Sequence, residues 1–187
     1  ALSRKANRPV KLVMSREEVF RASGPTSSTS IDVKLGAKKN GEITAGQVEL
    51  RYQGGAFPGT WAMLGCMTAF ACYDIKNQQS VGYDVIGNRP KVPAYRAPSA
   101  PMAAFAVEST LELLADKIGM SGIDLRLKNV AREGAKAPYG PIYGPIGIEA
   151  ALKAVKDHPH MKAKLKKNQG RGIACGFWFN IGGQTCT

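Results

Sequence analysis

Apolar side chains recur every three or four residues between positions 103 and 118, and acidic side chains fall on a different face of the same spacing. This pattern predicts an amphipathic helix with a core side and an acidic side. The helix should begin near residues 99–101, because Pro101 fits a first helical turn, where no N–H partner is required. The apolar positions are Ala103, Val107, Leu111, Leu114 and Ile118, and the acidic ones are Glu108, Glu112 and Asp116.

Alternation of apolar and polar residues predicts a β-hairpin formed by residues 30–36 and 42–52. The intervening Asn40-Gly41 tolerates the positive φ that a tight turn requires. Apolar positions change phase within the second strand, and a bulge near Gly46 is expected to bring both sets to one face. Apolar stretches predict further strands at 9–14, 80–87 and 171–181, the last of them central.

Capping residues place the other helices. Ser15 and Glu18 form a capping box for a short helix reaching about residue 22. Ser121 fits the N-cap of a helix that reaches about residue 132. Further helices are predicted at 60–73, where nearly every side is apolar, and at 147–157, where the pattern is amphipathic.

Glycine and proline mark the turns between these elements. We interpret Gly54-Gly55 as a plain turn, with close backbone approach as the alternative. A loop rich in proline, glycine and tyrosine covers residues 135–147, and we place a sub-boundary near 134–147. The predicted fold class is therefore α+β, with mixed sheets and packed helices.

The chain has 187 residues and a formal net charge of +12, enough length for a sizeable core and an unusually basic balance. Its apolar runs are too short for a membrane span. The basic clusters contain no interleaved aromatic residues, so we expect solvated faces or a surface for an acidic partner subunit, and no nucleic acid. The cysteines, without CxxC spacing, predict reduced thiols in a cytoplasmic protein, although a disulfide pair stays open.

The tight turn at 95–98 just before the helix is the candidate ligand site. Arg96 there lies beside a helix N-terminus, whose free N–H groups and partial positive charge suit an anionic or oxo ligand. The alternative is a structural ion pair for Arg96. His158 and His160 have no cysteine or carboxylate companion nearby, so we predict no metal ligands in the chain. Neither a catalytic triad nor a phosphate-binding glycine loop is recognisable in the sequence.

Several motifs, in order along the chain, closely resemble the molybdenum-binding large subunit of the xanthine dehydrogenase, aldehyde oxidase and carbon monoxide dehydrogenase family. They include Asn-Arg-Pro-Val-Lys-Leu-Val-Met-Ser-Arg-Glu-Glu at 7–18, Ala-Tyr-Arg-Ala-Pro at 94–98 and Ala-Phe-Ala-Val-Glu at 104–108. Asp-Leu-Arg-Leu-Lys-Asn at 124–129 and Arg-Gly-Ile-Ala at 171–174 are also similar to the family. The resemblance covers essentially the whole of 1–187, which it identifies as an internal fragment of a molybdopterin-binding domain.

The resemblance implies a molybdenum-dependent oxidoreductase that hydroxylates an aldehyde or aromatic heterocycle, with water as the oxygen source. It implies a molybdenum–pterin cofactor, with iron–sulfur clusters and FAD on partner subunits or domains. The full assembly is then expected to be a dimer of heterotrimers in the cytoplasm. The electron acceptor, whether NAD, quinone or another protein, would be set by the partners.

By the same resemblance, Tyr95, Arg96 and Ala97 match the family loop whose backbone approaches the molybdenum ligands. Pro98 and Ser99 match the part that shapes the substrate pocket. The copper-binding cysteine of carbon monoxide dehydrogenases is Ala97 here, which argues against carbon monoxide as substrate. The phenylalanine that purine-oxidising members place two residues after the arginine is Pro98 here, which argues against a purine.

The family's catalytic glutamate and a pterin-binding segment are expected downstream of residue 187. We therefore expect no catalytic residue within this chain, and little or no cofactor or activity in the chain alone. Two alternatives stay open: a catalytically inactive scaffold of the same fold, and a basic module that binds nucleic acid or an acidic protein.

Overall fold

The computed structural model describes residues 1–179. Residues 180–187, with Cys186 and the end of the strand predicted at 171–181, lie outside that range. The helices are α1 Leu2–Ala6, α2 Arg16–Ala22, α3 Ala62–Thr68, α4 Ala100–Ile118, α5 Gly122–Asn129, α6 Ile148–Asp157 and α7 Pro159–Lys162. The strands are β1 Thr29–Ala37, β2 Ile43–Gly55 and β3 Asn77–Ile86.

The strands form one mixed sheet of order β1-β2-β3. β1 and β2 are the predicted antiparallel hairpin, and β3 pairs with β2 in parallel. The predicted bulge is displaced: the register shifts between Gly36 and Ala37, opposite Thr44, while Gly46 pairs regularly with Leu35. The shift at Thr44 buries Ile43 together with the inward-facing Val48 and leaves Ala45 exposed.

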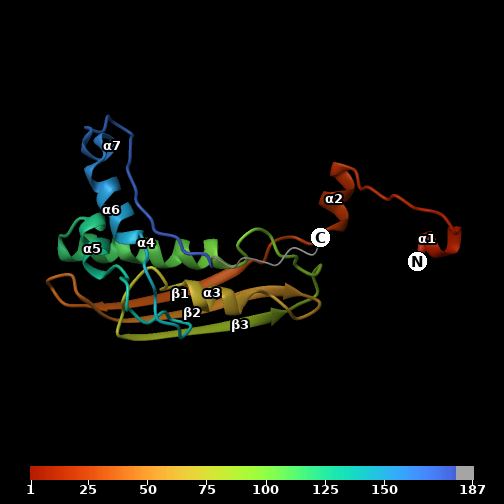
Figure 1. Cartoon of the computed structure of the whole chain (residues 1–187), viewed down its shortest axis with the longest axis horizontal. Coiled ribbons are helices and arrows are strands. Elements are labelled where there is room, and N and C mark those ends of the chain that lie inside the picture. Colours follow the sequence, from red (N-terminus) through yellow and green to blue (C-terminus); the bar gives the residue numbers. More distant parts are fainter. Residues whose placement is uncertain (180–187) are drawn as a thin grey trace.

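Helices α3 and α4 pack on one face of the sheet, and α4 runs along it (Figure 1). The apolar stripe predicted for α4 is confirmed, with Ala103, Val107 and Leu111 almost completely buried. They meet Leu50 and Tyr52 of β2, which are fully buried. The α+β class with a mixed sheet is thus confirmed.

The predicted acidic side of α4 is wrong for Glu108, which is buried. The side chain of Arg126 on α5, with no exposed surface, donates from Nε to Glu108 Oε2 at 2.8 Å. The Tyr73 hydroxyl donates to Glu108 Oε1 at 2.5 Å, and the Cys175 N–H donates to Oε2 at 2.9 Å. Burial raises the pKa of Tyr73, so this phenol remains a donor. Glu112, half-exposed, also pairs with Arg126.

Asn129 at the end of α5 fixes the hairpin to the helices. Its Oδ1 accepts a hydrogen bond from the N–H of Ile43, and its Nδ2 donates to the carbonyls of Gly41 and Leu125, each at 2.8 Å. All these contacts are buried, so they take the place of water for backbone groups at the start of β2.

Other boundaries differ from the sequence prediction. The helix expected at 60–73 is limited to α3, after which tight turns carry the chain to residue 73. Residues 9–14 form no strand, because no described segment lies beside them to complete a ladder. The capping box at Ser15 is confirmed, as is the Ser121 N-cap, although α5 ends at Asn129.

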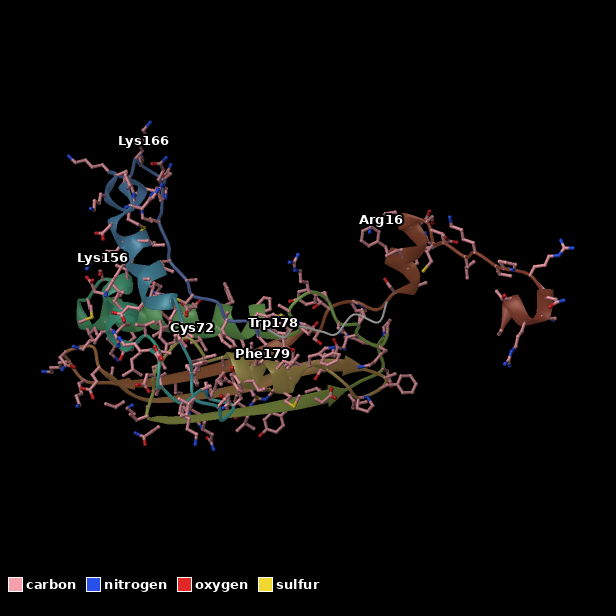
Figure 2. All side chains as sticks on the ribbon, viewed as in Figure 1. Arg16, Cys72, Lys156, Lys166, Trp178 and Phe179 are labelled. Atoms are coloured by element: carbon pink, nitrogen blue, oxygen red, sulfur yellow. The ribbon has the colours of Figure 1, made fainter. Side chains whose placement is uncertain are left out.

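At opposite ends of the molecule, two parts project from this body. The α1–α2 arm carries exposed apolar side chains, including Leu12 and Phe20, and extends away from the sheet (Figure 1). Helices α6 and α7, with the segment that follows them, form a second arm that carries basic side chains such as Lys156 and Lys166 (Figure 2). Among the described residues, no helix is long and apolar enough to cross a bilayer.

Candidate functional site

The candidate site is the loop between β3 and α4, at residues 94–99. The segment that leads from β3 into this loop, residues 87–92, is held by close backbone contacts with the end of β2. The N–H of Val92 donates to the Gly54 carbonyl at 3.2 Å, and that of Gly87 to the Gly55 carbonyl at 3.0 Å. Gly55 has φ of +79°, and a Cβ there would lie 2.2 Å from the Pro90 carbonyl oxygen. The glycine pair therefore allows close backbone approach, and the plain turn was the wrong interpretation.

Within the loop, Ala97 and Ser99 both have positive φ, at 55° and 69°, and they flank Pro98. Non-glycine residues rarely adopt this conformation, and such strained positions concentrate at functional sites. The Ser99 carbonyl accepts a hydrogen bond from the hydroxyl of Tyr52 on β2 at 2.9 Å. Burial raises the pKa of Tyr52 to about 12, which keeps this donor protonated at physiological pH.

The loop presents hydrogen-bond donors. Among the described residues, no acceptor meets the backbone N–H of Tyr95, Arg96 or Ala97, and the Ser99 side chain does not cap α4. Arg96 is exposed and makes no ion pair with a described residue, which removes the structural alternative in this part of the chain. A 19-residue helix begins next to these donors. The arrangement suits a ligand that carries oxo or other acceptor oxygen atoms.

A cavity of about 610 Å³ lies beside the loop, between the first turns of α4 and the strand β1. Tyr95 lines it, and its hydroxyl lies 2.9 Å from Met102 Sδ. The cavity is also lined by Met102 and the exposed Phe105 of α4, by Thr26 in the chain before β1, and by Thr29, the first residue of β1. Its wall is mixed, with aromatic and hydroxyl side chains, as in sites for small organic molecules.

The predicted site residues thus share one loop but separate in depth. Tyr95 and Arg96 are exposed, and Ala97 and Pro98 are half-buried. Ser99 is 2% exposed and does not line the 610 Å³ cavity. Sequence reasoning missed Met102 and Phe105. Their signal was an apolar pair on the first turns of the helix that falls outside the buried stripe.

Among residues 1–179, no set of metal-binding side chains is present at this site. Residues 1–179 contain no group of three or more histidine, cysteine or carboxylate side chains that could hold an ion. The three described cysteines form no disulfide, and burial raises the pKa of Cys72. The N–H groups of the loop that lack a described acceptor suit a ligand that is held by hydrogen bonds.

Residues 1–130 match the protein family described as the molybdopterin cofactor-binding domain. The chain belongs to this family. The matched range contains the sheet, α4, α5 and the whole candidate loop.

Curated relatives extend the match beyond residue 130. The chain is 32% identical over 170 residues to the aldehyde oxidoreductase of Megalodesulfovibrio gigas, which covers 89% of this chain and 18% of that protein. It is 29% identical over 157 residues to the nicotinate dehydrogenase large molybdopterin subunit of Eubacterium barkeri, covering 80% and 36%. The chain therefore spans only a minor part of the relatives' length.

Solved structures of molybdenum enzymes have a similar fold. The aldehyde oxidoreductase from Desulfovibrio gigas superposes with a TM-score of 0.69 at 28% identity, over 74% of this chain and 15% of that chain. The fold described above is thus part of a molybdopterin-binding domain.

Proposed function

We propose that this chain is part of the large subunit of a molybdenum hydroxylase, and that its 94–99 loop contacts the molybdenum–pterin cofactor. The observation that carries the proposal is the strained loop with free N–H donors at the start of α4, inside the region matched to the molybdopterin cofactor-binding domain. When bound, the cofactor supplies the oxidative hydroxylation of carbon with oxygen from water.

In this proposal, the chain's own residues orient the cofactor and form part of the substrate pocket. Backbone N–H groups of Tyr95, Arg96 and Ala97 donate to acceptor atoms of the cofactor, and the Arg96 guanidinium adds positive charge there. Pro98, which has no N–H, fixes the backbone between the two positive-φ residues. Ser99 supports the loop through its carbonyl and its buried side chain. In this proposal its part in the substrate pocket is indirect.

The substrate class is an aldehyde or an aromatic heterocycle. Tyr95 and Phe105 give the 610 Å³ cavity two aromatic walls, and Thr26 and Thr29 give it hydroxyl groups. The relatives named aldehyde oxidoreductase and nicotinate dehydrogenase act on substrates of these kinds. Ala97 in place of the copper-binding cysteine excludes carbon monoxide from the proposal, and Pro98 disfavours a purine.

The rest of the enzyme lies outside this chain in our proposal. The base is a glutamate downstream, electrons leave through iron–sulfur clusters and FAD on partner subunits or domains, and the assembly is a cytoplasmic dimer of heterotrimers. The chain alone accordingly holds little cofactor and is inactive. A scaffold of the same fold that has lost catalysis is the second candidate.

Molybdenum content per polypeptide tests the proposal. It is measured by elemental analysis on the longer polypeptide, expressed with its neighbouring subunits in a host that makes the cofactor. We expect a value near one, and a drop of at least about tenfold in Arg96→Ala, since one charged hydrogen bond contributes roughly 1.5–3 kcal/mol. Arg89→Ala, which removes an exposed cation on the segment leading into the loop, serves as the matched control. Content near zero in the parent would favour the scaffold.

A further inference from the structure

Residues 171–179 have the side-chain pattern of a β-strand, but no described strand pairs with them. Their exposure alternates without a break: Ile173, Cys175 and Phe177 are half-buried, whereas Ala174 and Gly176 between them are exposed. This period of two is that of a strand with one face on a core. Figure 1 shows the segment descending from α7 and then running along α4.

The inward side chains hold the segment firmly against the body. Ile173 packs on the cluster of Ile123 and Leu152, and Phe177 on that of Tyr143. The Phe177 and Tyr143 rings lie 6.2 Å apart at their centroids. The segment is therefore an ordered extended chain, fixed by side chains rather than by a backbone ladder.

The backbone of this segment is unpaired within the part of the chain that the structure describes. Residues 170–179 make no backbone–backbone hydrogen bond with any described residue, and the one satisfied N–H, of Cys175, donates to the Glu108 carboxylate. Successive N–H groups of a strand point to opposite edges. Those of Ala174 and Gly176 therefore point away from Glu108, along an edge without partners.

Apolar hollows lie beside the segment at two places. One of about 330 Å³ is bounded by Ile173, Ala174 and the outer face of α4, including Phe105, which is 77% exposed. The other, of about 350 Å³, is bounded by Gly176, Phe177 and the start of α6. An additional strand would place apolar side chains in such hollows and give its backbone groups partners.

We propose that residues 171–179 are a sheet strand whose open edge, marked by the N–H groups of Ala174 and Gly176, pairs with an extended apolar segment from the remainder of a longer polypeptide. Length favours this occupant over a second copy. The chain spans 18% and 36% of two relatives that it matches along most of its own length, so most of each relative lies outside the matched region. The pairing does not depend on cofactor binding or activity.

Amide hydrogen exchange tests the pairing in the 187-residue chain and in the longer polypeptide. We expect the N–H groups of Ala174 and Gly176 to exchange almost freely in the short chain, and at least about 100-fold more slowly in the long one. Fast exchange in both would overturn the proposal. Slow exchange in the short chain that fades on dilution would assign the edge to a second copy and overturn the proposed occupant.

A proline substitution gives the second measurement. Ala174→Pro removes an N–H that has no acceptor among the described residues, so the melting temperature should fall in the longer polypeptide and stay within about 2 °C of the parent in the short chain. Lys164→Pro, in the exposed segment after α7, is the matched control and should leave both unchanged. An equal fall for Ala174→Pro in both polypeptides would show a local backbone clash and overturn the pairing.

Discussion

Two neighbouring regions of the chain differ in how their polar groups are hydrogen-bonded. One is the 94–99 loop, and the other is the middle of α4, around Glu108. In the middle of α4, Glu108 is buried and paired, with Arg126 and Tyr73 as its partners. In the loop, Arg96 is exposed and backbone N–H groups are free of described partners. Both regions contain motifs that resemble one enzyme family. The Glu108 region is closed by its own hydrogen bonds, whereas the loop leaves donors and a cation without described partners. We therefore expect a charged motif residue to support the fold where its environment pairs it, and to be available to a ligand where it does not.

The largest expected effect is that of Arg126→Met, which leaves the buried Glu108 carboxylate without its cation. Breaking such a pair costs about 3–5 kcal/mol of unfolding free energy. Urea denaturation followed by circular dichroism measures the change. Lys156→Met, which removes an exposed ion pair with Asp124, is the control and should shift the midpoint far less. Equal shifts would mean that the Glu108 network contributes no more than a surface pair.

Asn129→Ala should have the next largest effect, because it leaves the Ile43 N–H and the Gly41 carbonyl buried without partners. We expect a loss of about 2–3 kcal/mol in urea unfolding. Asn129→Asp keeps an acceptor for Ile43 but loses both amide donors, so it should also be destabilised. The control is Asn77→Ala, whose side chain donates to a carbonyl at an exposed position. A loss no larger than that of the control would refute the role of Asn129.

Ala97→Gly probes the loop side of the comparison and should stabilise the chain. Glycine relieves the positive φ at this position but gains freedom in the unfolded state, so the net increase is about 0.5–1 kcal/mol. Thermal unfolding measures it, with Ala94→Gly outside the strained pair as a control that should destabilise slightly. If the Ala97 variant is less stable than the parent, the strain assigned to this loop is absent.

The sequence predicted features that depend on residues close together in the chain better than features that depend on distant ones. The α4 stripe, the Asn40-Gly41 turn and the Ser15 cap depend on neighbours within a few residues, and these predictions are confirmed. The burial of Glu108 depends on α5, 18 residues later, and could not be seen from the periodicity of one helix.

The same limit applies to the candidate site. The sequence located the loop at 95–99, but its strain and the packing of Gly54-Gly55 against Pro90 arise from segments that meet only in the fold. The strand predicted at 9–14 was wrong, and the described part of the strand predicted at 171–181 forms no ladder with a described residue. Strand formation also needs a partner, and no pattern within a segment supplies one. The roles of residues 95–99 and the sub-boundary near 134–147 stay predictions.

The smallest expected effect is the pH dependence of the melting temperature that Glu149, on the α6–α7 arm, contributes. Hydrogen bonds from Arg132 and then Lys153 lower the pKa of Glu149 to about 2 from its usual 4.5. A carboxylate with a lowered folded-state pKa stabilises the fold above its unfolded pKa, and this contribution is lost as pH falls from about 4.5 to about 2. Glu149→Gln should therefore melt slightly below the parent at pH 7, and the gap should close by pH 2. Glu133→Gln, an exposed carboxylate without an ion pair among the described residues, should show no gap at either pH. A gap for Glu149→Gln that persists unchanged to pH 2 would mean that shape, rather than charge, stabilises the start of α6.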